Sequence, residues 1–144
     1  MIRKATTDDL SVLTELACVL WPGHAVAELQ AELLRIMTQP EAVFYLAMED
    51  EGAVGFAQCQ LRHDYVEGTD TSPVGYLEGI YVMEGYRDRG IASALLLACE
   101  SWAKSNGCVE FASDCQLDNV QSLRFHLKVG FEEAGRIICF TKQL

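Results

Sequence analysis

Residues 77–102 constrain the fold of this chain more than any other stretch. The first six, residues 77–82, are mostly aliphatic or aromatic around one glycine, which predicts a strand with a local irregularity. Beyond a short turn, apolar residues recur at helical spacing and share one face of a predicted helix. These residues are Ile91, Leu95, Cys99 and Trp102. The sequence therefore predicts a strand, a tight turn and a helix in direct succession.

The turn at residues 87–92 has the features of an anion-binding site. Gly90 allows a ligand to approach the backbone, and N–H groups in the first turn of the helix lack partners within the helix. Arg87 and Arg89 add positive charge. Two common nucleotide-binding motifs, G-x-x-x-x-G-K-[ST] and G-x-G-x-x-G, do not occur. The natural ligand of such a turn is a phosphate or pyrophosphate, but this motif taken alone favours an ordinary solvated turn.

The acidic balance of the chain excludes several classes of partner. A formal net charge of −10 argues against nucleic acid and anionic membranes, and it is compatible with a cationic substrate. A charged surface that only confers solubility explains it equally well. No apolar run approaches the roughly 20 residues that span a bilayer, and the first eight residues contain no apolar signal core. We therefore expect a cytoplasmic protein that binds no membrane.

The six cysteines are scattered without a C-x-x-C pair, and the three histidines are separate in sequence. Several cysteines lie in apolar patterns, so we expect buried free thiols. We expect no metal site.

The remaining pattern predicts one mixed α/β domain over residues 1–144 with a largely antiparallel sheet. The predicted strands are 2–5, 43–49, 54–61, 77–82, 109–113 and a final hairpin of 131–134 and 136–142. The predicted helices carry apolar stripes over 10–20, 26–37, 91–105 and 120–129. Gly107 and Gly130 end the last two helices. The order is β-αα-βββ-α-β-α-ββ.

Two polar regions could contact a substrate. Trp21 and His24 lie at the break between the first two helices, where they could form the lip of a pocket, although Trp21 could equally fill the core. Residues 62–73 form a predicted loop with three carboxylates and an aromatic side chain. Such a loop suits a polyamine or an amino sugar, or it is a mobile surface loop without a ligand.

Two spaced motifs resemble the GNAT superfamily of acyl-CoA-dependent N-acetyltransferases. Residues 87–92 correspond to the pyrophosphate loop Q/R-x-x-G-x-G/A, with Ala92 in place of the final glycine. A second motif, N-x-x-A/S…K-x-G-F, corresponds to Asn119, Ser122, Phe125, Lys128, Gly130 and Phe131. The resemblance covers nearly the whole chain and implies acetyl-CoA as the co-substrate.

Further stretches are similar to the aminoglycoside 6′-N-acetyltransferases, namely residues 21–24, 62–68, 72–73, 77–80 and 112–114. This resemblance implies an aminoglycoside site lined by Trp21, His24, Tyr65, Glu78 and Asp114. It implies that acetyl-CoA is held by Ile80, Tyr81, Val82, Arg87, Asp88, Arg89, Gly90, Ile91, Ala92 and Asn119. It also implies a homodimer, and a 6′-acetylation activity that confers antibiotic resistance.

Glu78 is the candidate catalytic residue, because it flanks the expected thioester site and could orient a water relay to the acceptor amine. Asp114 is the candidate anchor for a second ammonium group. Both could instead be solvated strand ends. His126 lies where many GNAT enzymes have a tyrosine acid, and Gly135 lies where some relatives have an acidic acceptor contact.

Two other functions stay open at this point. The same chemistry could act on another cationic amine, such as a polyamine or a peptide amine. Alternatively, the chain could be a non-catalytic acyl-CoA-binding module.

Overall fold

The computed structural model describes all 144 residues. The strands are β1 (Ile2–Lys4), β2 (Ala42–Glu49), β3 (Gly52–Arg62), β4 (Val74–Val82) and β5 (Phe111–Ser113). The α-helices are α1 (Leu10–Leu20), α2 (Val26–Met37), α3 (Ile91–Ser105) and α4 (Val120–Lys128). Short 3₁₀ helices at Thr7–Asp9 and Glu84–Tyr86 precede α1 and α3. Every predicted element up to residue 130 is present, with small shifts at the ends.

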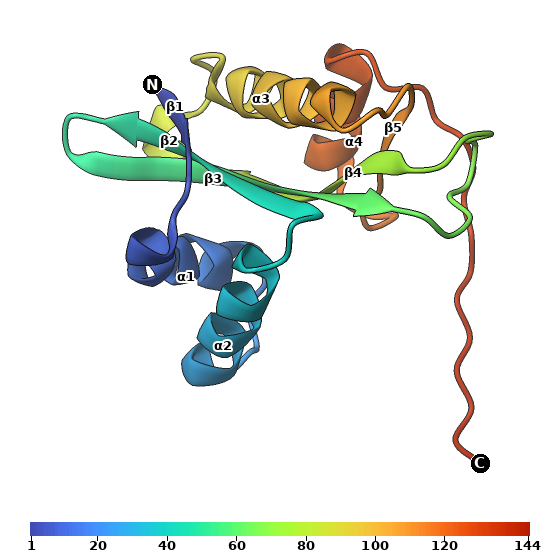
Figure 1. Cartoon of the computed structure of the whole chain (residues 1–144), viewed down its shortest axis with the longest axis horizontal. Helices are drawn as coiled ribbons and strands as arrows, with labels where there is room; N and C mark the ends of the chain where they lie inside the picture. The colour runs from blue at the N-terminus through green and yellow to red at the C-terminus, as the bar shows by residue number, and fades with distance from the viewer.

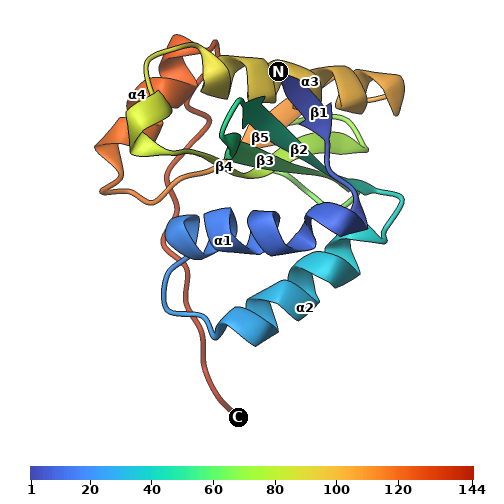
Figure 2. The same ribbon diagram turned by 90° about the vertical axis from the view of Figure 1, so that its left-hand side faces the viewer.

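The five strands form one sheet in sequence order, β1-β2-β3-β4-β5. The first three pairings are antiparallel, and only β4 and β5 run parallel. Helices α1 and α2 cover one face of the sheet, and α3 and α4 cover the other (Figures 1 and 2). The predicted mixed, mostly antiparallel α/β architecture is thereby confirmed. None of the helices combines the length and apolar character that crossing a lipid bilayer requires.

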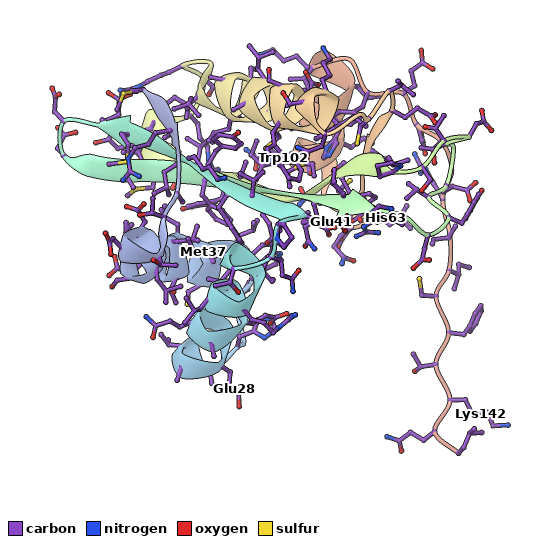
Figure 3. All side chains as sticks on the ribbon, in the orientation of Figure 1. Glu28, Met37, Glu41, His63, Trp102 and Lys142 are labelled. Atoms are coloured by element: carbon purple, nitrogen blue, oxygen red, sulfur yellow. The ribbon has the colours of Figure 1, made fainter.

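Alternating side chains on the strands fill both sides of the sheet. Phe44, Leu46 and Phe56 pack with α1 and α2, where Leu13 and Leu33 are fully buried. On the opposite face, a second cluster joins Val43, Ala57, Cys59 and Leu77 to Leu95 and Cys99 of α3. Trp102 of α3 is partly buried against that second cluster and lies between the helix and the sheet (Figure 3). The predicted apolar face of α3 therefore faces the core.

Strand β4 contains the predicted irregularity, and the unpaired residue is Glu78. Gln58 of β3 is opposite Gly79, and the next residue, Cys59, is opposite Leu77. Glu78 is thus the extra residue of a β-bulge. A bulge bends the strand and redirects the side chain at that position.

Strands β4 and β5 pair over only three residues, from Gly75 to Leu77 on β4. From Glu78 to Val82, the side of β4 that faces away from β3 has no partner strand. The part of β4 that has no second partner strand therefore begins at the bulge. Backbone groups along this edge of β4 are available for a ligand.

The predicted C-terminal hairpin is wrong. Residues 131–144 form neither a helix nor a strand, and the chain leaves the domain as an extended tail (Figures 1 and 2). The β-rich composition of this tail favours strands, but a strand needs a hydrogen-bonding partner, and none in this chain pairs with it. Ile138 and Phe140 are consequently 81% and 88% exposed.

Candidate active site

Glu78 is held by an arginine from the neighbouring strand. Arg62, the last residue of β3, donates from Nε to Oε1 of Glu78 at 2.9 Å and from Nη2 to Oε2 at 2.8 Å. The guanidinium group also lies 3.4 Å from the centroid of the Tyr76 ring. A planar fork stacked on an aromatic ring fixes the carboxylate more firmly than a single-point contact would.

The second predicted carboxylate, Asp114, lies in the same network. It follows β5 directly and accepts a hydrogen bond from the hydroxyl group of Tyr76. Burial, followed by this hydrogen bond, raises the pKa of Tyr76, so the phenol stays protonated and acts as the donor. Tyr76 therefore connects Asp114 to Arg62 and hence to Glu78. The structure brings the two acidic residues of the predicted acceptor site together.

Trp21 reaches the same region from the end of α1. Its ring packs edge-on against Phe56 at a centroid distance of 5.8 Å, and it also borders the bulge. A β-carbon at Gly79 would lie 2.5 Å from Cζ2 of Trp21. Trp21 is therefore both a core residue, as one interpretation predicted, and a wall beside Glu78. His24 is exposed in the following turn, with no side-chain hydrogen bond.

Tyr65 is further out, on the loop that follows β3. It is 80% exposed and donates its hydroxyl hydrogen bond to Glu67 at 3.1 Å. A shallow hollow of about 450 Å³ is lined by residues 61–65, including Arg62 and Tyr65. No hydrogen bond joins Tyr65 to Glu78 or Asp114. The structure thus places Tyr65 beside the site rather than within the network.

The acidic loop is fastened to the domain. Glu110 accepts hydrogen bonds from the backbone N–H groups of Asp70 and Thr71 at 2.9 and 2.8 Å. Where the loop starts, His63 and Glu41 are 2.8 Å apart (Figure 3). Near its centre, Glu67 Oε1 would lie 3.6 Å from a β-carbon at Gly135. Gly135 supplies no acidic side chain, but the carboxylate of Glu67 lies next to this position.

The predicted anion loop has the geometry of an oxyanion or phosphate cradle. Asp88 has a φ of 60°, and Gly90 has a φ of 78° at the N-cap of α3. No side chain caps the helix, so its first-turn N–H groups, at Ile91, Ala92 and Ser93, are free to bind a ligand. All of residues 87–90 are exposed.

The two arginines of this loop are tied to backbone carbonyl groups. Arg87 Nε donates to the Val82 carbonyl at 2.9 Å, and Arg89 Nη2 donates to the Gly85 carbonyl at 3.0 Å. These bonds hold the loop against the end of β4. They leave most guanidinium N–H groups available for an anion.

Asn119 and His126 organise α4. Asn119 Oδ1 accepts from the Ser122 N–H at 3.0 Å, as an N-cap does, and its amide NH₂ is left as a donor. His126 is 2.7 Å from the Ser122 carbonyl through Nδ1 and 2.9 Å from Ser113 Oγ through Nε2. His126 thus joins α4 to β5, and we assign it no acid role.

All six cysteines are free, and three of them (Cys59, Cys99 and Cys108) are buried. The neighbouring Cys99 thiol and burial raise the pKa of Cys59, so this thiol is inert.

Comparison with known proteins identifies the family and the fold. The Acetyltransferase (GNAT) family matches residues 10–131. An aminoglycoside N(6′)-acetyltransferase type 1 from Acinetobacter genomosp. 13 is 45% identical over 127 residues, which is 88% of this chain and 86% of the relative. The chain therefore belongs to the GNAT family of acetyltransferases.

Solved structures narrow the similarity further. AAC(6′)-Iy, in complex with the bisubstrate analogue CoA-S-monomethyl-acetylneamine, has a TM-score of 0.95 and 39% identity, covering 100% of this chain and 98% of that one. AAC(6′)-Ih from Acinetobacter baumannii has a TM-score of 0.93 and 41% identity, with the same two coverages. The predicted resemblance to aminoglycoside 6′-N-acetyltransferases is confirmed.

Sequence reasoning missed two residues of the site, Arg62 and Tyr76. Arg62 lies inside a stretch that resembled the family, but its pairing with Glu78 spans 16 positions. The available signal was charge: Arg62 is the one cation between an apolar strand and an acidic loop. For Tyr76, no signal distinguished it from an ordinary strand residue.

Proposed function

We propose that this protein transfers the acetyl group of acetyl-CoA to the 6′-amine of aminoglycosides and thereby confers resistance to them. The observation that carries the proposal is the position of Glu78. It is the bulged residue of β4, where the open edge of that strand begins. Trp21 borders the adjacent Gly79, and Asp114 is linked to Glu78 through Tyr76 and Arg62. A carboxylate is thus next to both the expected thioester and the expected amine. The full-length similarity to N(6′)-acetyltransferases supports this assignment.

Acetyl-CoA would bind along the open edge of β4 and at the start of α3. Backbone groups of Ile80, Tyr81 and Val82 would pair with the pantetheine arm as an added strand does. The pyrophosphate would accept hydrogen bonds from the N–H groups and form ion pairs with the arginines of one loop. This loop consists of Arg87, Asp88, Arg89, Gly90, Ile91 and Ala92. Asn119 would add its free amide NH₂.

The acceptor must lose a proton before it attacks. An alkylamine titrates near pH ~10, so about one molecule in a thousand is neutral at pH 7. Glu78 would orient a water molecule that takes this proton, and the neutral amine would then attack the thioester carbonyl. Backbone N–H groups on the β4 edge would stabilise the oxyanion. The C–S bond would then break, with the new amide nitrogen giving one proton to solvent and the departing thiolate taking one from it.

The acceptor site is suited to a polycation. Asp114 would bind a second ammonium group, while Trp21 and His24 would form one wall and Tyr65 the rim. Glu67, beside Gly135, would add a further carboxylate. An aminoglycoside carries several amines on rigid rings and can meet such spaced acids together, at a smaller cost in conformational entropy than a flexible polyamine.

A panel of acceptors tests this proposal against other amines. We expect kcat/KM with kanamycin to exceed that with spermidine or with a lysine peptide by at least 100-fold. Equal or higher kcat/KM with spermidine or the peptide would assign the site to that class instead. Acetyl-CoA binding without turnover of any amine would indicate a non-catalytic binding module.

We also propose that the protein is a homodimer in which the C-terminal tail lies on a second copy. Beyond Gly135 the chain leaves the domain, and Ile137, Ile138 and Phe140 are at least three-quarters exposed. Burial of such side chains is favourable, and the outer edge of β5 offers unpaired backbone groups to an added strand. An extended apolar tail and an unpaired sheet edge in the same chain support strand exchange between two copies.

Sedimentation velocity tests the dimer. The double variant Ile138→Asp and Phe140→Asp should shift the protein to the monomer. A matched control is Leu97→Asp, because Leu97 is also an exposed apolar residue, at 61%, but lies on α3. A dimer that persists in the double variant, or is lost equally in the control, would contradict the assigned interface.

The free cysteines and the use of acetyl-CoA support a cytoplasmic location, where thiols stay reduced. We further propose that residues 1–144 act as one N-acetyltransferase domain.

A further inference from the structure

The guanidinium group of Arg62 lies next to the two carboxylates of the proposed acceptor site. It is bonded to both oxygens of Glu78, and it stacks on Tyr76, which in turn donates to Asp114. The side chains of Arg62 and Glu78 are 41% and 20% exposed, so a ligand can reach the pair. One cation is thus placed between the two carboxylates of the proposed acceptor site.

Each of these carboxylates would have two opposing effects on the reaction. A bare carboxylate beside an ammonium group stabilises the charged form, which favours binding but raises the pKa of the amine by about one to three units. The amine attacks only when it is neutral. A cation that is already paired with the carboxylate weakens this effect while leaving the oxygen atoms in place.

The bidentate pair is not required for strand pairing. In the β3–β4 ladder, the backbone partner of Arg62 is Val74, and Glu78 is the bulged residue without a partner. Glu78 is the one residue of β4 that has no backbone partner in β3, and its pair with Arg62 fixes its side chain. This is a positioning role rather than a role in strand registration.

The charged and titratable groups around Glu78 are few. Strand β3 contributes Arg62 and the buried Cys59 thiol, β4 contributes Tyr76, and the end of β5 contributes Asp114. From α1, the groups at the bulge are the uncharged side chains of Leu20 and Trp21. Arg62 is thus the only cation in this set.

We propose that Arg62 is a positioning residue that orients Glu78 and withholds part of its negative charge from the ammonium group of the bound acceptor. This inference rests on the proposed function, because it takes Glu78 to face the acceptor amine. Its chemical consequence is that the bound amine loses its proton at a lower pH than it would beside an unpaired carboxylate.

The pH dependence of kcat tests this role, since kcat reports ionisations in the enzyme–substrate complex. In Arg62→Gln, the midpoint of the kcat profile should rise by about one pH unit, and kcat at pH 7 should fall about tenfold. KM for the aminoglycoside should stay equal or fall, because Glu78 then binds the ammonium group with its full charge. In Arg62→Lys, which keeps the charge, the midpoint should stay near the wild-type value.

The matched control is Arg3→Gln. Arg3 also forms a bidentate pair, with Asp9 at 2.8 and 2.7 Å, but this pair lies next to β1 and α1. This variant should leave both the midpoint and kcat unchanged.

A merely structural role of Arg62 predicts a different result. Activity in Arg62→Gln would then fall by the same factor at every pH, with an unmoved midpoint, and that result would overturn the inference. If Arg62→Gln does not fold, Arg62→Met takes its place, because it keeps an unbranched side chain over Tyr76 and also removes the charge. A raised midpoint in Arg62→Met supports charge compensation, and an unmoved midpoint overturns it. Failure of the proposed function is separate, since it would appear as absent aminoglycoside turnover in the wild-type protein.

Discussion

The indole ring of Trp21 lies against Gly79, so that a β-carbon at Gly79 would come within 2.5 Å of Cζ2 and 2.9 Å of Cη2 of the ring. The end of α1 and the bulge of β4 are therefore in contact with no space between them. This contact aligns one wall of the proposed acceptor site with Glu78. It also explains why the residue after Glu78 has no side chain.

Gly79→Ala should destabilise the protein through this contact. The added methyl group overpacks the site against Trp21 and Leu20, at a cost of about 1–3 kcal/mol. For a domain of this size, each kcal/mol lowers Tm by about 4 °C, which thermal denaturation would detect. Gly85→Ala is the control, because a β-carbon there meets no atom within 4 Å. Equal Tm values for the two variants would contradict the contact.

Gly90→Ala should weaken acetyl-CoA binding more than it weakens the fold. A β-carbon at Gly90 meets no protein atom, so the fold bears only the backbone strain of a φ of 78°, about 1–2 kcal/mol. We expect KM for acetyl-CoA to rise at least tenfold, because the methyl group would enter the space of the pyrophosphate.

Gly107→Ala provides the matched comparison. Gly107 follows α3, has a φ of 85° and also has open space around it. Its substitution should cost similar stability and leave KM for acetyl-CoA unchanged. A similar KM for acetyl-CoA in both glycine variants would show that the loop of residues 87–92 does not bind the pyrophosphate.

Glu78→Gln should lower kcat/KM for the aminoglycoside at least tenfold, because an amide cannot accept a proton through a water relay. The shape of the side chain is retained but the charge that pairs with Arg62 is lost, so Tm should fall by a few degrees while the protein stays folded at the assay temperature. Glu49→Gln, at the exposed end of β2, serves as the control. Wild-type kinetics of Glu78→Gln across the pH range would eliminate a catalytic role for this residue.

The Arg3–Asp9 pair should make stability depend on pH. The side-chain hydrogen bonds from Arg3, followed by the Thr6 N–H, hold the pKa of Asp9 well below its usual range. A carboxyl with a depressed folded pKa contributes stability above its unfolded pKa near 3.9, and this contribution is lost as the pH falls further.

Asp9→Asn should therefore be less stable than the wild type by about 1 kcal/mol at pH 7, a modest value because Arg3 is partly exposed to solvent. The difference should shrink as the pH falls from 4 to 2. Urea unfolding at several pH values measures it, and a difference that does not vary with pH would argue against the pair.

The parts of this structure that depend on residues close together in the sequence were predictable from it. The spacing of Leu95 and Cys99 sets the buried face of α3, and Gly90 marks its start. Likewise, the glycine in β4 indicated an irregular strand. These features arise from local sequence periodicity and from backbone preferences.

Features that depend on pairing between distant segments were not predictable in this way. The register with β3 makes Glu78, rather than Gly79, the unpaired residue, and the strand pattern does not specify that register. The Arg62–Glu78 pair depends on the same register. The prediction of a C-terminal hairpin was wrong for a related reason. The apolar alternation at Ile138 and Phe140 indicates a strand but does not specify which strand it pairs with.

The most direct test of the account compares two acceptors that differ at one position. Neomycin carries an amine at the 6′ position, whereas paromomycin carries a hydroxyl group there and is otherwise the same. Thiol release from acetyl-CoA should be rapid with neomycin and absent with paromomycin, which should still bind and inhibit. Turnover of both compounds, or of neither, would contradict 6′-N-acetylation.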